Sequence, residues 1–236
     1  MLKTIAFIMV IGIATPGCSR SEDAELFHRL SAKAEAGASA AQYNLGMLYN
    51  NGIGVEQNPA QAFRWFEKAA NAGDPLGHYE VGRYYAGQFR GIVEVDEAKA
   101  LTHKLVAAEA GYVLAQYDVA LAYTYAGNFE EAAKWWKHAA DQGDITGLWA
   151  LAGWHKEGQG VPPDAAKAYE YLLTVVRLVP ESQARQAKPL LDELRSTLDD
   201  ATARKSEEAA ASWVPKRSPL TLRAAQGIEE AKKLAL

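Results

Sequence analysis

The stretch that decides the fold is AAQYNLGMLYNNGIGV at residues 40–55, continued by AFRWFEKAANAGD at residues 62–74. In each part, apolar and small residues recur at intervals of three or four: Ala41, Leu45, Leu48 and Tyr49, then Ala62, Trp65, Phe66 and Ala69. This spacing places each set on one face of a helix. Gly52 and Gly54 separate the two parts and are typical of a turn. The stretch therefore predicts two helices that pack against each other through their apolar faces.

Three partial copies of this stretch follow it along the chain. The glycine that precedes each copy recurs at spacings of 36, 38 and 32 residues, at Gly37, Gly73, Gly111 and Gly143. Other columns agree with this register: Leu45, Val81, Val119 and Leu151; Gly46, Gly82, Ala120 and Ala152; Ala62, Ala100, Ala132 and Ala168. Repeats of this length indicate a solenoid, in which each unit packs on its neighbours. We predict an all-α chain with about four helix pairs at residues 34–180, in units 34–73, 74–110, 111–142 and 143–180.

Turn and cap residues support these boundaries. Asn58-Pro59 supplies a helix cap and a first-turn proline, and Pro163-Asp164 marks the equivalent start in the fourth copy. The recurring glycines lie just past the predicted helix ends, where a left-handed backbone conformation suits glycine. Before the repeats, residues 18–33 are predicted to contain a tether and an N-terminal capping helix. The helical pattern itself covers residues 22–35 and so continues into the start of the first unit.

Residues 181–236 are predicted to form a C-terminal helical cap and tail. An amphipathic helix is indicated by Leu190, Leu191, Leu194 and Leu198, and residues 201–213 predict another. These helices would cover the apolar face of the last repeat, which a solenoid must shield from water. Residues 219–236 are consistent with a further helix, although Gly227 falls inside it. The sequence leaves the role of this last segment open.

These motifs resemble those of the Sel-one-like repeat family, which is related to the tetratricopeptide repeats. The family pattern is Ala-x-x-x-Leu-Gly-x-x-Tyr-x-x-Gly-x-Gly-Val, then Ala-x-x-Trp-Phe/Tyr-x-x-Ala-Ala-x-x-Gly, and residues 41–55 and 62–73 match it almost throughout. The second copy has a longer loop at residues 88–95, and the third has a compact turn at residues 126–129. The resemblance covers residues 34–180. It implies a right-handed α-solenoid that serves as a scaffold for protein–protein interaction.

Composition excludes several classes of function. Hydrophobic residues make up 49% of the 236 positions, which is ample for a core. The formal charge of −4 becomes −5 without residues 1–17, whose only charge is Lys3. This mild acidity argues against nucleic-acid binding, which needs clustered lysine and arginine. The single cysteine, Cys18, excludes a disulfide framework or a Cys-x-x-Cys metal or redox site within one molecule.

Residues 1–19 have the order of an export signal: Lys3, an apolar run of 11 residues from Ile5 to Thr15, then small and turn residues. The run is far shorter than the roughly 20 residues that span a bilayer as a helix. The following Thr15-Pro16-Gly17-Cys18 resembles a bacterial lipobox. We predict a signal peptide at residues 1–17, lipidation at Cys18 and a periplasmic lipoprotein of the inner or outer membrane. The alternative is an ordinary cleaved signal and a soluble periplasmic protein.

No catalytic or metal-binding motif is apparent in the sequence. Gly52-Ile53-Gly54 and Gly158-Gln159-Gly160 neither follow a strand nor continue into a phosphate-binding motif, so we interpret them as turns. The five histidines stand outside any His-Glu-x-x-His motif, and there is no Gly-x-Ser-x-Gly nucleophile elbow. We predict no catalytic residue, no metal and no cofactor, and hence a protein that is not an enzyme. An envelope enzyme or ligand-binding protein is the contrasting alternative.

The first helix of each unit supplies the candidates for partner binding, because the first helices of tetratricopeptide arrays line the concave surface. Aromatic and arginine side chains make strong interface anchors. Arg83 and Tyr125 also depart from the family pattern and are the leading candidates. The predicted partner-binding residues are Tyr43, Met47, Asn50, Tyr79, Arg83, Tyr117, Leu121, Tyr125, Trp149 and Lys156. The aromatic column among them is equally consistent with packing between helices.

The second helices carry aromatic residues that we interpret as core packing residues: Trp65, Phe66, Trp135, Trp136 and Tyr171. We therefore predict an exported, lipid-anchored scaffold or adaptor that binds a protein or peptide in its concave groove. A more specific alternative is a periplasmic immunity protein that neutralises a secreted toxin. The sequence identifies neither the partner nor the oligomeric state.

Overall fold

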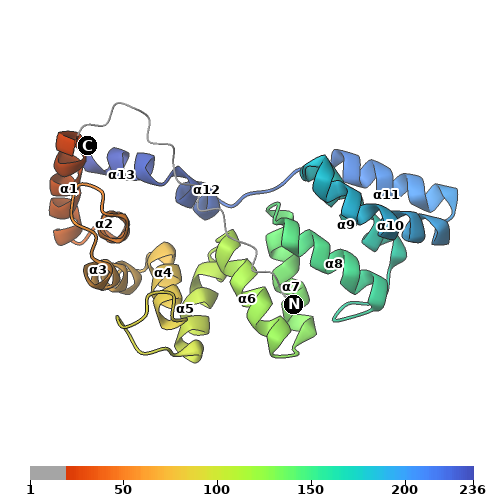
Figure 1. Cartoon of the computed structure of the whole chain (residues 1–236), viewed down its shortest axis with the longest axis horizontal. Coiled ribbons are helices and arrows are strands. Elements are labelled where there is room, and N and C mark those ends of the chain that lie inside the picture. Colours follow the sequence, from red (N-terminus) through yellow and green to blue (C-terminus); the bar gives the residue numbers. More distant parts are fainter. Residues whose placement is uncertain (1–19) are drawn as a thin grey trace.

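The computed structural model describes residues 20–236, which form thirteen helices (Figure 1). The helices are α1 (Arg20–Glu35), α2 (Ser39–Asn51), α3 (Pro59–Asn71), α4 (Pro75–Tyr85), α5 (Glu97–Glu109), α6 (Val113–Tyr125), α7 (Phe129–Asp141), α8 (Ile145–Glu157), α9 (Ala165–Leu178), α10 (Glu181–Thr197), α11 (Asp200–Ser212), α12 (Pro219–Gln226) and α13 (Ile228–Ala235). None of these described helices is both long and apolar enough to cross a membrane. The predicted signal peptide and the predicted lipidation site Cys18 lie outside the described residues.

Consecutive helices pack side by side, as an α-solenoid requires. Four pairs, α2/α3, α4/α5, α6/α7 and α8/α9, correspond to the predicted units, and each second helix also packs on the first helix of the next pair. Helix α1 packs on α2 in the position expected of an N-terminal capping helix. In Figure 1 the pairs follow one another along an arc from α1 to α9. The prediction of an all-α solenoid is confirmed.

The second helix of each pair begins at an Asn or Asp cap. The side-chain oxygen of Asn58 accepts a hydrogen bond of 3.0 Å from the backbone N–H of Gln61, and the equivalent bonds at Asp96, Asn128 and Asp164 measure 2.9, 3.3 and 2.9 Å. Each cap satisfies a backbone donor that the start of a helix leaves free. The four recurring glycines have φ between 82° and 96°, as predicted for a left-handed position after a helix end.

Close approach of the paired helices explains the columns of small residues. A Cβ on Gly46 would lie 2.6 Å from the ring of Phe66, and a Cβ on Gly82 would lie 2.9 Å from a backbone oxygen of α5. The Phe66 ring is fully buried and contacts the rings of Tyr43 and Tyr84, with centroids 6.0 and 6.2 Å away. Because the interior is close-packed, a larger residue at Gly46 or Gly82 would push the paired helices apart.

The aromatic residues predicted to be core lie at two depths. Phe66 and Trp136 are 0% and 3% exposed. Trp65, Trp135 and Tyr171 pack against the hydrophobic clusters but remain partly exposed. Neighbouring residues on a helix point about 100° apart, so two adjacent aromatic side chains cannot both face the centre of the core. The predicted packing role is confirmed, and the outer member of each pair forms the edge of the core.

The C-terminal residues divide into a cap and a returning segment. Helices α10 and α11 pack on α9, where they cover the last repeat as predicted. The chain then leaves α11 in an extended conformation and reaches α12, and α13 packs on α1 and α2 at the opposite end of the solenoid (Figure 1). Gly227, with φ of 51°, separates α12 from α13. Residues 213–236 are called the C-terminal tail below.

Candidate partner-binding surface

The first helices α2, α4, α6 and α8 form the inner face of the solenoid, and the C-terminal tail lies across part of it. Figure 1 shows α12 and α13 spanning the opening of the arc between α9 and α1. The tail follows the amino-terminal ends of the first helices, because it bonds to Asp74 before α4 and to Gly111 and Val113 at the start of α6. It therefore covers one edge of the surface on which we predict a partner to bind.

A hydrogen-bond network holds the middle of the tail to two turns between repeats. The Ser218 hydroxyl donates to the Gly111 carbonyl at 2.7 Å, and the Thr221 hydroxyl donates to the side-chain carbonyl of Gln142 at 2.8 Å. The same Gln142 oxygen accepts from the backbone N–H of Ser218 at 2.9 Å, and its amide donates to Gln116 at 2.8 Å. Thr221 and Gln142 are 9% and 8% exposed. A buried polar group without a hydrogen-bond partner is costly, so moving the tail would leave the side-chain oxygen of Gln142 unpaired. The network therefore fixes the position of the tail on the two turns.

An ion pair anchors α12 to the second repeat. The Asp74 carboxylate caps α4 by accepting a 2.9 Å bond from the N–H of Leu76, and its other oxygen accepts a bond from Arg223. The Asp74 side chain is 1% exposed and that of Arg223 is 24% exposed. The guanidinium also lies 5.7 Å from the centroid of the Tyr43 ring and 4.0 Å from Glu230. A buried carboxylate needs a charged partner, and the tail supplies the one that Asp74 binds.

Helix α13 completes the apolar core at the amino-terminal end of the solenoid. Ala231 and Ala235 are 2% and 7% exposed. They cluster with leucines of α1 and α2: Leu26, Leu30, Leu45 and Leu48. A small cavity of about 90 Å³ remains between α2 and the tail, lined in part by Tyr43, Met47 and Ile228. The tail thus packs on the first repeat through α13 and on the second and third repeats through Leu220 and Ala224 of α12.

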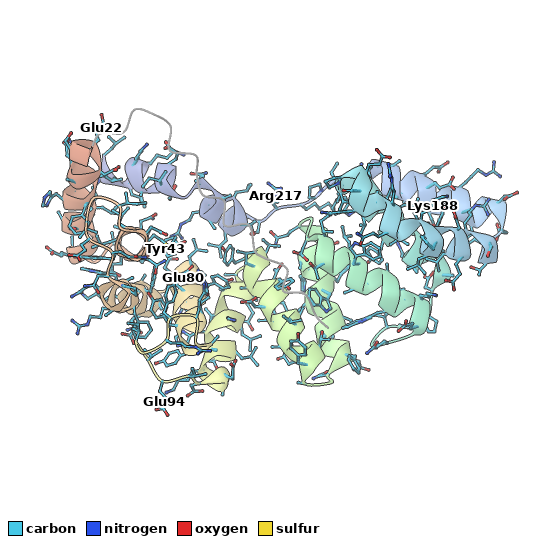
Figure 2. The ribbon with its side chains drawn as sticks, in the orientation of Figure 1. Glu22, Tyr43, Glu80, Glu94, Lys188 and Arg217 are labelled. Atoms are coloured by element: carbon cyan, nitrogen blue, oxygen red, sulfur yellow. The ribbon has the colours of Figure 1, made fainter. Side chains whose placement is uncertain are left out.

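A second buried ion pair lies beside this anchor. Glu80 is 4% exposed, and both of its oxygens accept bonds from Arg83, at 2.8 and 2.9 Å. Burial raises the pKa of Glu80, and the Arg83 guanidinium opposes that rise. Burial also raises the pKa of Tyr43 well above its ordinary value. Figure 2 shows Tyr43 and Glu80 on the side of the first two repeats that faces the tail. The surface beneath the tail therefore combines the neutral Tyr43 ring with two ion pairs, Glu80 with Arg83 and Asp74 with Arg223.

Four of the ten predicted partner-binding residues are covered or buried. Tyr43 and Met47 lie beneath the tail. The Asn50 side chain is 9% exposed and accepts a hydrogen bond from Tyr84. Tyr79 is 8% exposed, and its ring meets that of Tyr112 edge to face with centroids 4.8 Å apart. These four side chains stabilise the folded chain itself.

The other six predicted residues differ in how much free surface they offer. Arg83 is half-buried, with bonds to Glu80 and Gln88. Three others, Tyr117, Leu121 and Trp149, are partly buried against the apolar cluster that contains Trp136 and Leu151. Lys156 forms an ion pair of 2.9 Å with Glu193 of α10. Tyr125, at the carboxyl end of α6, is 79% exposed. All ten residues lie in the described part of the chain, and among them Tyr125 is the one large hydrophobic side chain that stays exposed.

Sequence reasoning missed the contacts of the tail, because no repeat pattern runs through it. One local signal was present: Ser218-Pro219 begins a helix, and the Ser218 hydroxyl accepts a 3.0 Å bond from the N–H of Thr221. A cap of this kind predicts where α12 starts but says nothing about where the helix packs. Arg223 meets Asp74 across 149 positions of sequence.

Sequence reasoning also missed a pair of histidines between α4 and α5. The Nδ1 atoms of His78 and His103 lie 3.0 Å apart. Burial lowers the pKa of both side chains, so the folded chain favours their neutral forms. Residues 20–236 contain no group of three or more His, Cys, Asp or Glu side chains arranged to hold a metal ion.

Comparison with known proteins agrees with the repeat register. The Sel1 repeat profile matches residues 39–74, 75–112, 113–144 and 146–174, one match for each helix pair. The chain belongs to the Sel1 repeat family. Among solved structures, a Sel1 repeat protein from Oxalobacter formigenes is similar, with a TM-score of 0.64 and 30% sequence identity over 71% of this chain and 49% of that one. Sel1 repeats generally mediate protein–protein interaction.

Two curated relatives share part of their length with this Sel1 repeat chain. The putative sel1-like repeat-containing protein L21 of Acanthamoeba polyphaga mimivirus is 31% identical over 126 residues, which is 52% of this chain and 22% of the relative. The alginate biosynthesis protein AlgK of Azotobacter vinelandii is 29% identical over 174 residues, which is 73% of this chain and 29% of the relative. The chain thus spans less than a third of the length of either relative.

Proposed function

We propose that this Sel1 repeat protein is a non-enzymatic scaffold that binds a protein or peptide partner on the inner face of its solenoid. The C-terminal tail is the observation that carries the proposal. The inner face holds an extended segment and two short helices through hydrogen bonds, a buried ion pair and apolar contacts. A face with these features has the chemistry to bind a helix or an extended peptide of another protein.

The partner is proposed to contact the part of the inner face that the tail leaves uncovered. The tail follows the amino-terminal ends of the first helices, whereas Tyr125 and Lys156 stand near the carboxyl ends of α6 and α8. Tyr125 is 79% exposed, and tyrosine is enriched among the residues that dominate binding energy. This arrangement lets the partner and the tail occupy the inner face together.

Site-specific photo-crosslinking tests this surface. A photoreactive phenylalanine analogue in place of Tyr125 is expected to capture a defined partner in intact cells. The same analogue in place of Arg64, which is exposed on the second helix α3, is the matched control and should not capture that partner. Capture of the same proteins at both positions, or at neither, would contradict the assignment. With the partner identified, Tyr125→Ala should weaken the complex by roughly tenfold or more.

We further propose that the protein is exported and held at a bacterial membrane, in the periplasm, by lipid on Cys18. The support is the order of residues 1–19: one basic residue, an apolar run of 11 residues and a single cysteine. Two or three acyl chains make a stable tether. Mass spectrometry of the mature amino terminus should find a lipid-modified Cys18, and an intact Met1 would contradict the anchor. If the captured partner is a secreted toxin in a tight one-to-one complex, the protein acts as an immunity protein.

A further inference from the structure

A pocket on the side of the second helices lies between α7 and α9, away from the inner face. Its volume is about 390 Å³. Its walls include Ala133 and Lys137 of α7, Leu151 and His155 of α8, Val161 of the following turn and Tyr171 of α9. The pocket therefore lies at the junction between the third and fourth repeats and contains none of the ten predicted partner-binding residues.

The corresponding junction between the first and second repeats is filled by an aromatic ring of the chain itself. In the register of the repeats, Ala133 corresponds to Phe63 of α3, and His155 corresponds to Tyr85 of α4. Phe63 is 8% exposed, and its ring centroid lies 5.0 Å from that of Tyr84 and 6.1 Å from that of Tyr85. The space that is a pocket in one junction thus holds a buried phenyl ring in the other.

The junction between the second and third repeats is also filled from within. Leu101 stands in the position of Ala133, and Leu105 stands in the position of Lys137. Both leucines pack against the hydrophobic cluster of that junction. The third junction therefore lacks an apolar side chain that both earlier junctions possess, because alanine ends at its Cβ.

The other side chains around the pocket are packed against one another. The His155 ring stacks on the Tyr171 ring, with centroids 5.7 Å apart and an interplanar angle of 21°. Leu151, at the base of the pocket, is 1% exposed. Three charged side chains line the pocket, and two of them are paired: Lys134 with Glu131 and Lys137 with Asp141. The third, Glu130, disfavours an anionic ligand, so a neutral apolar group fits the walls best.

We propose that this pocket binds an exposed aromatic side chain of a protein partner, inserted between α7 and α9 where Phe63 stands in the first junction. The pocket volume falls within the range of small-ligand sites, and its walls are largely apolar, as such sites usually are. Aromatic anchors buried in pockets are common centres of protein interfaces. The site is separate from the inner face, so it stands whether or not Tyr125 contacts the partner.

The test uses the isotope-labelled protein and N-acetyl-phenylalaninamide as the probe for an aromatic side chain. Saturable NMR shifts are expected at the backbone amides of Ala133, Leu151, Gly160 and Val161, with an affinity of roughly millimolar for so small a ligand. The corresponding leucine amide should bind more weakly, and the alanine amide should cause no shift. An equal response to the leucine and phenylalanine probes would overturn the aromatic assignment.

Filling the pocket from within provides the decisive variant. Ala133→Phe should abolish the shifts while the unfolding midpoint stays the same or rises, because the first repeat carries this residue at this position. Ala133→Leu, which copies Leu101, should weaken binding of the probe at least about tenfold. This variant replaces Ala133→Phe in the test if the phenylalanine variant fails to fold. Ala98→Phe, at an exposed position in the first turn of α5, is the matched control and should bind normally. Shifts that persist in both Ala133 variants, or that are absent in the unaltered protein, would overturn the proposal.

Discussion

Asp74 has two roles in this fold, because one carboxylate caps α4 and also binds the C-terminal tail. Its Oδ1 accepts from the N–H of Leu76, and its Oδ2 accepts from Arg223. Capping is a local interaction that a sequence can reveal, and it contributes about 1 kcal/mol. The ion pair is non-local, and its effect is larger because the carboxylate is almost fully buried.

Arg223→Ala should lower the free energy of unfolding by about 2 kcal/mol, as measured by urea denaturation. The variant leaves the Asp74 carboxylate buried without its charged partner, and the partial exposure of Arg223 places the loss below that of a fully buried pair. Arg185→Ala is the matched control, because its pair with Glu181 is 75% and 80% exposed and should contribute less than about 1 kcal/mol. Equal losses in the two variants would contradict the anchoring role of Arg223.

The pair His78 and His103 should make the fold sensitive to acid. Burial lowers the pKa of both side chains in the folded chain, whereas in the unfolded chain both titrate near the ordinary value of about 6.5. The unfolded state therefore binds more protons, so stability is fully present above that value and falls as the pH drops below it. Asp74 opposes the lowering at His78 without reversing it.

The double variant His78→Gln/His103→Gln should lose less stability than the unaltered protein between about pH 7.5 and about pH 5, where histidines titrate. Glutamine retains hydrogen-bonding groups but does not titrate in this range. Urea denaturation at each pH measures the effect, and His138→Gln, at an exposed position on α7, is the control. An acid dependence that is unchanged in the double variant would exclude the pair as its source.

At the scale of single helices, α3 shows how the repeat pattern builds the core. Its apolar residues face α2 and α4, and the fully buried Phe66 approaches Gly46 so closely that no Cβ would fit there. Trp65, one position earlier, packs at the edge, with the Lys68 ammonium 3.8 Å from its ring centroid. The helix periodicity predicts which residues face inward, and the pairing of helices decides how deeply each one is buried.

Phe66→Ala should destabilise the protein by about 3–5 kcal/mol, because it removes a fully buried ring and leaves a cavity. Trp65→Ala should cost about half as much, since water already reaches part of the Trp65 ring and less apolar area returns to solvent. Urea denaturation of the two variants under identical conditions measures the difference. A loss at Trp65 equal to that at Phe66 would show that both rings are equally essential to the core.

At the scale of the whole molecule, the tail connects parts of the solenoid that do not otherwise meet. Most contacts in a repeat protein are between neighbouring units, so the ends of an array are its least supported parts. Here α13 packs on α1 and α2, while the chain just before α12 bonds to the turns that flank the third repeat. The tail should therefore make unfolding of the first repeat depend on the later ones.

Ala231→Asp should detach α13, because it introduces a charge at a position that is 2% exposed. Hydrogen exchange measured by mass spectrometry should then show lost protection in α13, α1 and α2 and little change in α7 to α9. Leu236→Asp introduces the same charge at a position that is 91% exposed and is the matched control. Protection lost evenly along all repeats would contradict this account of the tail.

The sequence by itself determined the four helix pairs, the caps at Asn58 and Asp164, the left-handed glycines and the family. These features depend on contacts within a turn of helix or on residues that recur in every copy, so the pattern alone reveals them. Only the tertiary structure decided where residues 213–236 pack, that Asn50 and Tyr79 are buried, and that Ala133 leaves a pocket between α7 and α9. The physical reason is that the tail and the two buried side chains depend on single contacts between distant residues, such as Asp74 with Arg223, which leave no periodicity in the chain. The pocket depends on how α7, α8 and α9 pack around one small side chain, which the repeat pattern does not reveal.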